Sequence, residues 1–241
     1  MKAIAAEPIH RPKIYQEIAR RLEDQILEGR LQPGDALPSE RDLMERHGVG
    51  RPAVREALLS LQKAGLIAIQ NGERARVVRP SASSLVGELG SAARYLLSRE
   101  GGIRQFQQAR LFFEMGLVRH AALHASQDDI ARLAKALASN QAALADLDAF
   151  ATTDVAFHFV FAEITHNSIF VALHVALAEW LTEQRAATLQ RRGTALKALK
   201  AHRAILAAVA AHDPDSAETA MRQHLIDVEN TYWSVRSGQT R

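Results

Sequence analysis

One acidic residue and three histidines in the second half of the chain have the types and spacing of a metal site. Asp154 and His158 are four residues apart, so on a helix their side chains leave the same face. His202 and His224 come from two later segments. Three imidazoles and a carboxylate suit Zn²⁺ or another divalent metal. Spacing alone leaves a second interpretation open, since each histidine could also be an ordinary surface or core residue.

A metal site with these ligands could serve an enzyme as well as a sensor, because three histidines and a carboxylate can leave a position open for water. Glu163 is the nearest acidic residue to His158 that could act as a general base. Five positions along a helix, however, put it on a different part of the helix surface. The sequence therefore offers no separate base beside the cluster, and a metal-dependent enzyme remains the alternative to a ligand sensor.

Arginines in the first third of the chain indicate a different chemistry, contact with DNA. Arg51 and Arg55 are four residues apart at the start of an expected helix, so both project from one face. A guanidinium can bind guanine O6 and N7 through two hydrogen bonds, although two arginines can also simply solvate a helix. Other candidates for the same surface lie on the preceding helix and around an expected turn: Arg41, Asn71, Gly72, Arg74 and Arg76. Glycine in that turn lets the backbone approach the sugar-phosphate chain closely.

The distribution of charge supports a nucleic-acid partner for the first third. The whole chain carries a formal net charge of +3, and the entire excess lies in residues 1–79, whereas residues 80–241 are neutral. A basic domain joined to a neutral one suggests that the first meets a polyanion. Charge does not decide between a sequence-specific regulator and a nucleoid-like protein that binds any DNA.

Composition restricts the setting of the protein. The chain has no cysteine, which excludes disulfides, thiolate metal sites and a cysteine nucleophile and suits a reducing cytosol. No apolar run approaches the ~20 residues that span a bilayer, and the N-terminus has no apolar signal region. We expect a cytoplasmic protein that does not enter a membrane.

Proline positions mark the expected domain boundary. Six of the seven prolines fall in residues 1–80 and the last is Pro214, so the segment between can be helical without a break. The sequence predicts an N-terminal arm over residues 1–12, a DNA-binding domain over residues 13–79, a linker over residues 80–83 and an all-helical domain over residues 84–236. The fold class is mostly α, with a small β-hairpin in the first domain.

The first domain has the pattern of a winged helix-turn-helix. Apolar periodicity predicts helices over residues 14–29, 40–46 and 51–64. Ser39 and Asp42 offer a capping box for the second helix, and Gly65 can end the third. Residues 66–70 and 75–79 are rich in Ile and Val around Asn71-Gly72, which is typical of a β-hairpin.

The second domain is expected to be a bundle of helices. Amphipathic runs predict helices over residues 84–98, 103–124, 127–144, 149–165, 169–190, 195–211 and 216–235. Turn-forming residues separate these runs. The metal candidates then fall on three different helices, which must pack together if the four side chains are to meet.

Three segments of the first domain resemble the GntR family of bacterial repressors: Leu-Pro-Ser-Glu-Arg-Asp-Leu at residues 37–43, residues 49–58, and residues 61–66. The resemblance covers residues 13–79. It implies that Arg41, Arg51 and Arg55 contact operator DNA and that the wing tip lies in or beside the minor groove. The sequence departs from the family at residues 50, 52 and 53, where the family usually has Ser or Thr hydroxyls, so its operator preference is expected to differ.

The helical domain resembles the FadR-type effector-binding domain of that family, whose metal-binding members carry Asp-x-x-x-His followed by two distant histidines. The resemblance implies a metal held inside the bundle by Asp154, His158, His202 and His224, with open positions for a carboxylate effector. Arg110 matches an arginine that can bind the effector's carboxylate, although an ion pair with Glu114 is an equal alternative. Asn167 matches an asparagine that is either a helix cap or an effector-binding group.

Short matches across nearly the whole chain, at residues 71–77, 79–82, 87–89, 154–158, 174–177 and 212–215, resemble the sialic-acid-responsive repressors of the family. They imply a sialic acid or related sugar acid as effector. The N-terminal arm of those repressors is longer than residues 1–12 here. The resulting hypothesis is a homodimer that binds paired half-sites and responds to its effector, with an enzyme acting on a sugar acid as the alternative.

Overall fold

The computed structural model describes residues 13–70, 73–79, 81–87 and 89–238. The chain divides after Leu85 into two compact units, a few residues beyond the linker predicted at residues 80–83. Helices dominate both units, and the described part contains a single two-stranded sheet, so the mostly-α prediction is confirmed. Among the described helices, none is both long and apolar enough to cross a membrane.

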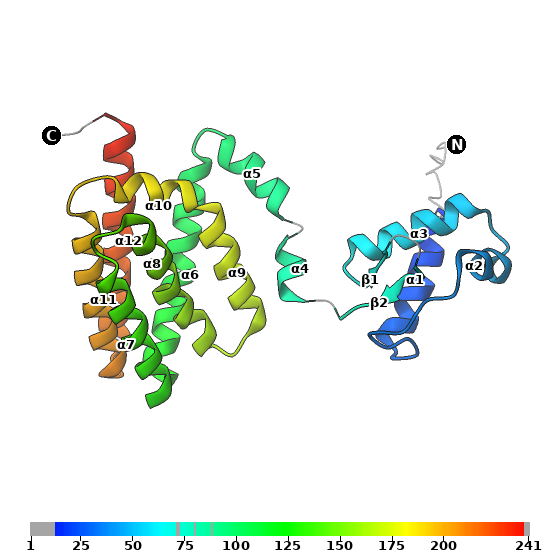
Figure 1. Cartoon of the computed structure of the whole chain (residues 1–241), viewed down its shortest axis with the longest axis horizontal. Coiled ribbons are helices and arrows are strands. Elements are labelled where there is room, and N and C mark those ends of the chain that lie inside the picture. The colour runs from blue at the N-terminus through cyan, green and yellow to red at the C-terminus, as the bar shows by residue number, and fades with distance from the viewer. Residues whose placement is uncertain (1–12, 71–72, 80, 88, 239–241) are drawn as a thin grey trace, which may run out of the picture. The chain divides into compact units, whose positions relative to one another are not determined.

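The first unit is a helix-turn-helix with a wing (Figure 1). Its helices are α1 (Ile14–Leu27), α2 (Glu40–His47) and α3 (Arg51–Lys63), and its strands are β1 (Ile67–Ala68) and β2 (Arg76–Val77). The strands are antiparallel, with Ile67 opposite Val77, and are shorter than predicted. The other edge of β2 pairs with the turn segment before α2, where Leu37 N–H donates to Ala75 O and Val77 N–H to Asp35 O. The predicted hairpin tip, Asn71-Gly72, lies outside the described residues.

Local sequence signals set the ends of α2 and α3. Ser39 Oγ accepts from Asp42 N–H and the Asp42 carboxylate accepts from Ser39 N–H, so the predicted capping box is present. Gly65 follows α3 with φ of 68°, a conformation that glycine adopts without strain. Buried apolar side chains then join α1, α2, α3 and the wing in one core, including Leu22, Leu43 and Leu61.

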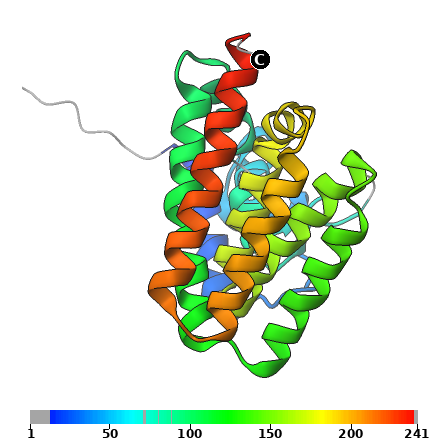
Figure 2. The same ribbon diagram turned by 90° about the vertical axis from the view of Figure 1, so that its left-hand side faces the viewer.

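The second unit is an antiparallel assembly of helices (Figure 2). Following α4 (Ala82–Gly87), which spans the division, the helices are α5 (Gly90–Ser98), α6 (Gly102–His124), α7 (Gln127–Ala142), α8 (Leu147–Ile164), α9 (Ser168–Trp180), α10 (Thr182–Leu189), α11 (Thr194–Ala210) and α12 (Pro214–Arg236). Helix α8 packs against α6, α7, α9 and α10, while α12 packs against α6 and α11. Phe157 and Phe161 of α8 are almost fully buried in this core. Helix α8 is therefore the element that carries side chains into the centre of the unit.

Two of the predicted helices are broken in the structure. The helix predicted over residues 84–98 is divided into α4 and α5 between Gly87 and Gly90, residues that weaken a helix interior. The helix predicted over residues 169–190 is divided at Leu181, whose φ of −101° and ψ of 15° leave the helical range. At this point the Thr182 hydroxyl and the Arg185 guanidinium both donate to the carbonyl of Ala178.

Candidate functional site: a buried metal centre and a DNA-reading face

Four side chains from three helices converge inside the second unit. Asp154 and His158 lie one turn apart on α8, His202 comes from α11 and His224 from α12. Each offers one donor atom, and these atoms all lie within 4.8 Å of one another. All four residues are buried. The structure thus brings together the whole ligand set that the sequence indicates.

A buried carboxylate from α6 orients His158. Glu114 contacts Nδ1 of His158 and also accepts a hydrogen bond of 2.5 Å from Nε of Arg110. Burial alone would raise the pKa of Glu114, but Arg110 and His158 hold that pKa well below its usual range. An ionised carboxylate only accepts, so Nδ1 carries the hydrogen and the lone pair of Nε2 faces the cluster. Nε2 of His224 lies 3.3 Å from that atom.

An asparagine on α7 orients His202 in the same way. The amide nitrogen of Asn140 donates to the carbonyl of Phe150 at 3.2 Å and to Oγ1 of Thr153 at 3.0 Å. The amide oxygen of Asn140 is thereby turned to Nδ1 of His202, 3.0 Å away, and must accept from it. Nε2 of His202 is then a free acceptor: it is buried, has no hydrogen-bond partner and lies 3.5 Å from Oδ1 of Asp154.

The protonation of the cluster suits a metal. Burial lowers the pKa of His202 to about 4, although the Asp154 carboxylate opposes the shift. Burial, followed by the neighbouring His202 and His158, lowers the pKa of His224 well below its usual value. These imidazoles are neutral at pH 7, as a metal ligand must be. Donors bound to one ion at about 2.1 Å lie at most about 4.2 Å apart, so a small contraction would close the cluster on an ion. The buried Asp and three His therefore fit a divalent metal.

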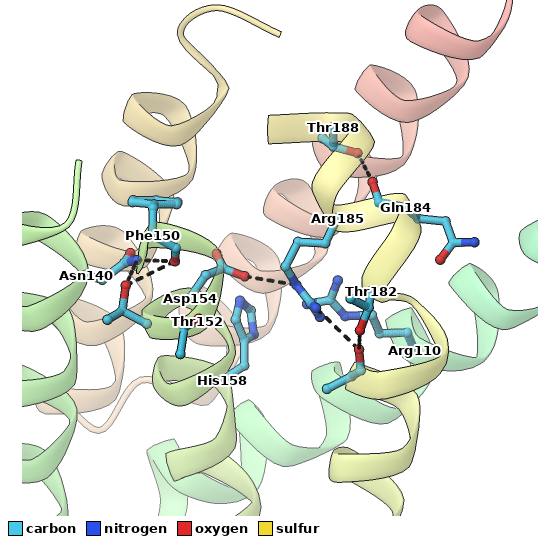
Figure 3. Close-up of polar contacts among 12 residues, drawn as sticks. Arg110, Asn140, Phe150, Thr152, Asp154, His158, Thr182, Gln184, Arg185 and Thr188 are labelled. Carbon is cyan, nitrogen blue, oxygen red and sulfur yellow. Dashed lines mark hydrogen bonds and ion pairs between the residues drawn. The ribbon is translucent and has the colours of Figure 1, made fainter. Parts of the chain in front are cut away.

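Two arginines stand beside the cluster (Figure 3). Arg185 reaches from α10 toward Asp154, with Nε 3.6 Å from Oδ2, and Arg110 lies next to it. A small cavity of about 10 Å³ is lined by both arginines, Glu114, His158 and His174. His174 is buried, its Nδ1 has no partner, and burial lowers its pKa to about 4. This face of the cluster therefore has free polar atoms and two positive charges.

The structure places three residues beside the cluster that the sequence did not indicate, and it places one candidate away from the cluster. The three added residues are Asn140, His174 and Arg185. The only sequence signal for them is a polar residue type on the buried face of an expected helix. Arg110 lines the cavity and also forms the predicted ion pair with Glu114. Asn167 is exposed and caps α9, its Oδ1 accepting from Ile169 N–H at 2.9 Å, so it is not among the residues at the cluster.

The DNA-reading candidates lie on an exposed face of the first unit. Nε of Arg51 and Nε of Arg55 are 3.7 Å and 3.0 Å from the carboxylate of Glu40, a partner that the sequence did not reveal. Arg55 and Arg74 line the same groove, of about 450 Å³, between α3 and the wing. Three further candidates differ in their surroundings: Arg41 is exposed on α2, Arg76 donates to the Gly34 carbonyl, and the tip at residues 71–72 is not described.

Comparison with known families assigns both units. The model of the gntR family of bacterial regulatory proteins matches residues 14–77, and the FCD domain model matches residues 105–227. This chain belongs to the GntR family. The HTH-type transcriptional repressor NanR of Escherichia coli (strain K12) is 45% identical over 242 residues, covering 98% of this chain and 90% of that protein. The NanR of Enterobacter sp. (strain 638) is 42% identical over 244 residues, covering 100% and 93%.

Solved structures agree on the fold. A GntR protein of Streptococcus agalactiae superposes with a TM-score of 0.57 at 24% identity, covering 90% of this chain and 99% of that chain. E. coli McbR/YncC gives a TM-score of 0.52 at 16% identity, covering 93% and 99%. The sequence relatives are transcriptional regulators. The chain is accordingly a DNA-binding regulator with an effector-binding C-terminal domain, and the enzyme alternative is not supported.

Proposed function

We propose that this protein is a homodimeric repressor whose binding to operator DNA is controlled by a small carboxylate effector held at Zn²⁺ in the helical unit. The repressor role follows the relatives, which carry that description. The effector class, a sialic acid or related sugar acid, follows the resemblance of short segments across the chain to sialic-acid-responsive repressors.

The observation that carries the sensor half is the free Nε2 of His202 among three other buried donors. A buried polar atom without a partner is costly, and a bound cation would satisfy it. Asp154, His158, His202 and His224 would hold the metal, and the metal would supply a Lewis-acid position for a carboxylate. The nitrogen-rich ligand set with one carboxylate suits Zn²⁺.

Charge balance supports an anionic effector. Around the small cavity, the charges of Arg110 and Arg185 balance those of Glu114 and Asp154. A divalent cation would leave an excess of positive charge in a buried place, because an imidazole that binds a metal contributes no charge. A carboxylate bound to the metal and to a guanidinium would offset that excess through charge-assisted hydrogen bonds.

The DNA half of the proposal uses the exposed arginines of the first unit. Arg51, Arg55, Arg41 and Arg74, with the wing tip at Asn71-Gly72, would contact the operator. A dimer would present two α3 helices to two half-sites. Effector binding would favour an arrangement of the helical units in which the two readers no longer match the operator.

Thermal-shift measurements with sialic acids, other sugar acids and hydroxy acids, with Zn²⁺ and with EDTA, test the sensor half. We expect a sugar acid to raise the melting temperature of the Zn²⁺-loaded protein and to weaken its binding to promoter DNA. His202→Ala should abolish both effects, while His124→Ala, which removes an exposed histidine, should preserve them. A full effector response in His202→Ala, or one unchanged by EDTA, would show that the metal site is not the sensor.

A further inference from the structure

Within the described part of the chain, four buried side-chain atoms lack a hydrogen-bond partner: His174 Nδ1, Gln184 Oε1, Arg185 Nε and His202 Nε2. All four lie at the cluster of Asp154 and the three histidines or at two adjoining cavities beside it. His202 Nε2 is accounted for by the metal. Arg185 Nε has no hydrogen bond but faces Oδ2 of Asp154 at 3.6 Å, in an ion pair. His174 Nδ1 and Gln184 Oε1 require a different explanation, because buried polar groups are nearly always satisfied.

The second cavity lies beneath α10. Its volume is about 30 Å³, and it shares Arg110 and Arg185 with the first cavity. From α10 it is lined by residues at positions i, i+3, i+4 and i+7, namely Leu181, Gln184, Arg185 and Thr188, which form one helix face. Opposite them lie Gln107 of α6 and Glu229 of α12. Leu225 and Val228 of α12 also line the hollow, so its walls are largely apolar and Gln184 is one of a few polar groups in it. One face of a short helix thus borders both the metal side and this hollow.

We propose that this hollow is a subsite for the polar tail of the effector, with Gln184 as its specificity-determining residue. The inference rests on the proposed function, in which the metal and a guanidinium bind the carboxylate. Arg185 and Gln184 leave α10 in different directions, Arg185 toward Asp154 and Gln184 away from it (Figure 3). A ligand whose carboxylate lies at Arg185 would therefore reach Gln184 only with groups well beyond its carboxylate.

The polar groups of the hollow, and not its apolar walls, select the class of tail. Gln184 Oε1 and the Glu229 carboxylate accept hydrogen bonds, so they call for hydroxyl or amide N–H donors. A hydroxyl also satisfies the amide nitrogen of Gln184, because it both donates and accepts. The subsite therefore fits a polyhydroxy or acylamino acid and disfavours an aliphatic carboxylate, which would leave Gln184 unpaired.

The size of the hollow requires α10 to move. The two cavities have room for only one or two waters each, much less than a sugar acid. Helix α10 begins after the break at Leu181 and ends at Leu189, and a short turn joins it to Gly193, whose φ is 83°. Displacement of this eight-residue helix would enlarge both cavities together.

Calorimetric titration of the Zn²⁺-loaded full chain tests the subsite. The probes are N-acetylneuraminate and gluconate, which have polar tails, and propionate, which has none. We expect one of the polyhydroxy acids to bind at least tenfold more tightly than propionate. Gln184→Leu and the unbranched Gln184→Met should weaken that acid by about 10- to 100-fold, with propionate and Zn²⁺ affinities changing less than twofold. Gln190→Leu, at the exposed end of α10, is the matched control and should behave as the parent protein.

The outcomes separate the two proposals. If both Gln184 variants bind the polyhydroxy acid within threefold of the parent protein, or if the parent protein does not prefer it to propionate, the subsite is wrong while the carboxylate sensor stands. If none of the three acids binds, or if EDTA leaves their binding unchanged, the proposed function itself fails and the subsite fails with it.

Discussion

At the scale of single residues, Asn140 decides which nitrogen of His202 faces the cluster. Its amide nitrogen is occupied by Phe150 and Thr153, so its oxygen must accept from Nδ1 of His202. Asn140→Leu removes this restraint without removing a ligand. We expect the affinity for Zn²⁺ to fall by about 10- to 100-fold, as is usual when a group that orients a metal-bound histidine is lost. Competition with a chromophoric chelator measures the change.

A matched variant separates orientation from general loss of stability. Asn230→Leu makes the same replacement at an exposed position of α12 and should leave Zn²⁺ affinity unchanged. Equal affinities in the two variants would mean that the hydrogen bond of Asn140 does not orient His202.

His174 gives the metal-free protein a pH-dependent stability. Burial lowers its pKa to about 4 from an ordinary value of 6.5 in the unfolded chain. The native state therefore binds fewer protons than the unfolded state between these values, so its stability is full above pH 6.5 and is lost as pH falls toward 4. At pH 4.5 the loss from this residue is roughly 2–3 kcal/mol relative to pH 7.

Urea unfolding in EDTA at pH 7 and pH 4.5 measures this contribution. The decrease in unfolding free energy between the two pH values should be smaller in His174→Leu than in the parent protein by about that amount. An equal decrease in both proteins would show that His174 titrates normally. His202 and His224, whose pKa values are also lowered, should continue to contribute in both.

The sequence could indicate the candidate metal ligands but not the residues that orient them. Asp154 and His158 share a helix face by their spacing, His202 and His224 were candidates by residue type, and the family resemblance supported the four as one set. Asn140 and Arg185 come from helices whose rotation about their axes the sequence does not determine. Each has an ordinary residue type, and it acquires its role only from the packing of α7 and α10 against α8.

At the scale of elements, α3 presents Arg51 and Arg55 next to the carboxylate of Glu40. Replacing Arg51 with Ala removes a guanidinium that could bind a guanine edge, a contact of about 1–3 kcal/mol. We expect binding to promoter fragments, selected from genomic DNA by the parent protein, to weaken by about 10- to 100-fold, with Zn²⁺ and effector binding unchanged. Fluorescence anisotropy at fixed salt measures binding to the promoter fragments and to random DNA.

Arg222→Ala is the control, since it removes the same charge from an exposed position of α12 in the other unit. It should bind the promoter fragments as the parent protein does. A uniform loss on specific and random DNA in Arg51→Ala would assign Arg51 to phosphate contact, and no loss would exclude it from the interface.

Helix positions were more predictable than helix interruptions. The capping box at Ser39 and the glycine after α3 are local signals, and the structure contains both. The break at Leu181 is not visible in apolar periodicity, because the apolar pattern continues through it without a glycine or proline. That missed break creates α10 as a separate element, and the proposed subsite depends on it.

At the scale of the whole molecule, the two units have separate cores. One cluster of buried apolar residues joins α1, α2, α3 and the wing, and other clusters lie wholly within the helical unit. The sequence indicated this division through its prolines and its charge. The candidate metal donors all belong to the helical unit, so metal binding should be coupled directly to the folding of that unit alone.

Differential scanning calorimetry should accordingly resolve two transitions, one for each unit. Zn²⁺ at 100 times its dissociation constant stabilises the state that binds it by about 2.7 kcal/mol, so it should raise only the transition of the helical unit, and EDTA should reverse the shift. Leu61→Ala leaves a cavity in the core of the first unit and should reduce the free energy of unfolding of that unit by about 2–5 kcal/mol. It should therefore lower the temperature of the other transition only. The units are energetically coupled if Zn²⁺ raises both transition temperatures equally. They are also coupled if the protein unfolds in a single transition whose temperature is shifted both by Zn²⁺ and by Leu61→Ala. Independent responses would instead mean that an effector signal depends on the geometry of the dimer and not on the stability of the DNA-reading unit.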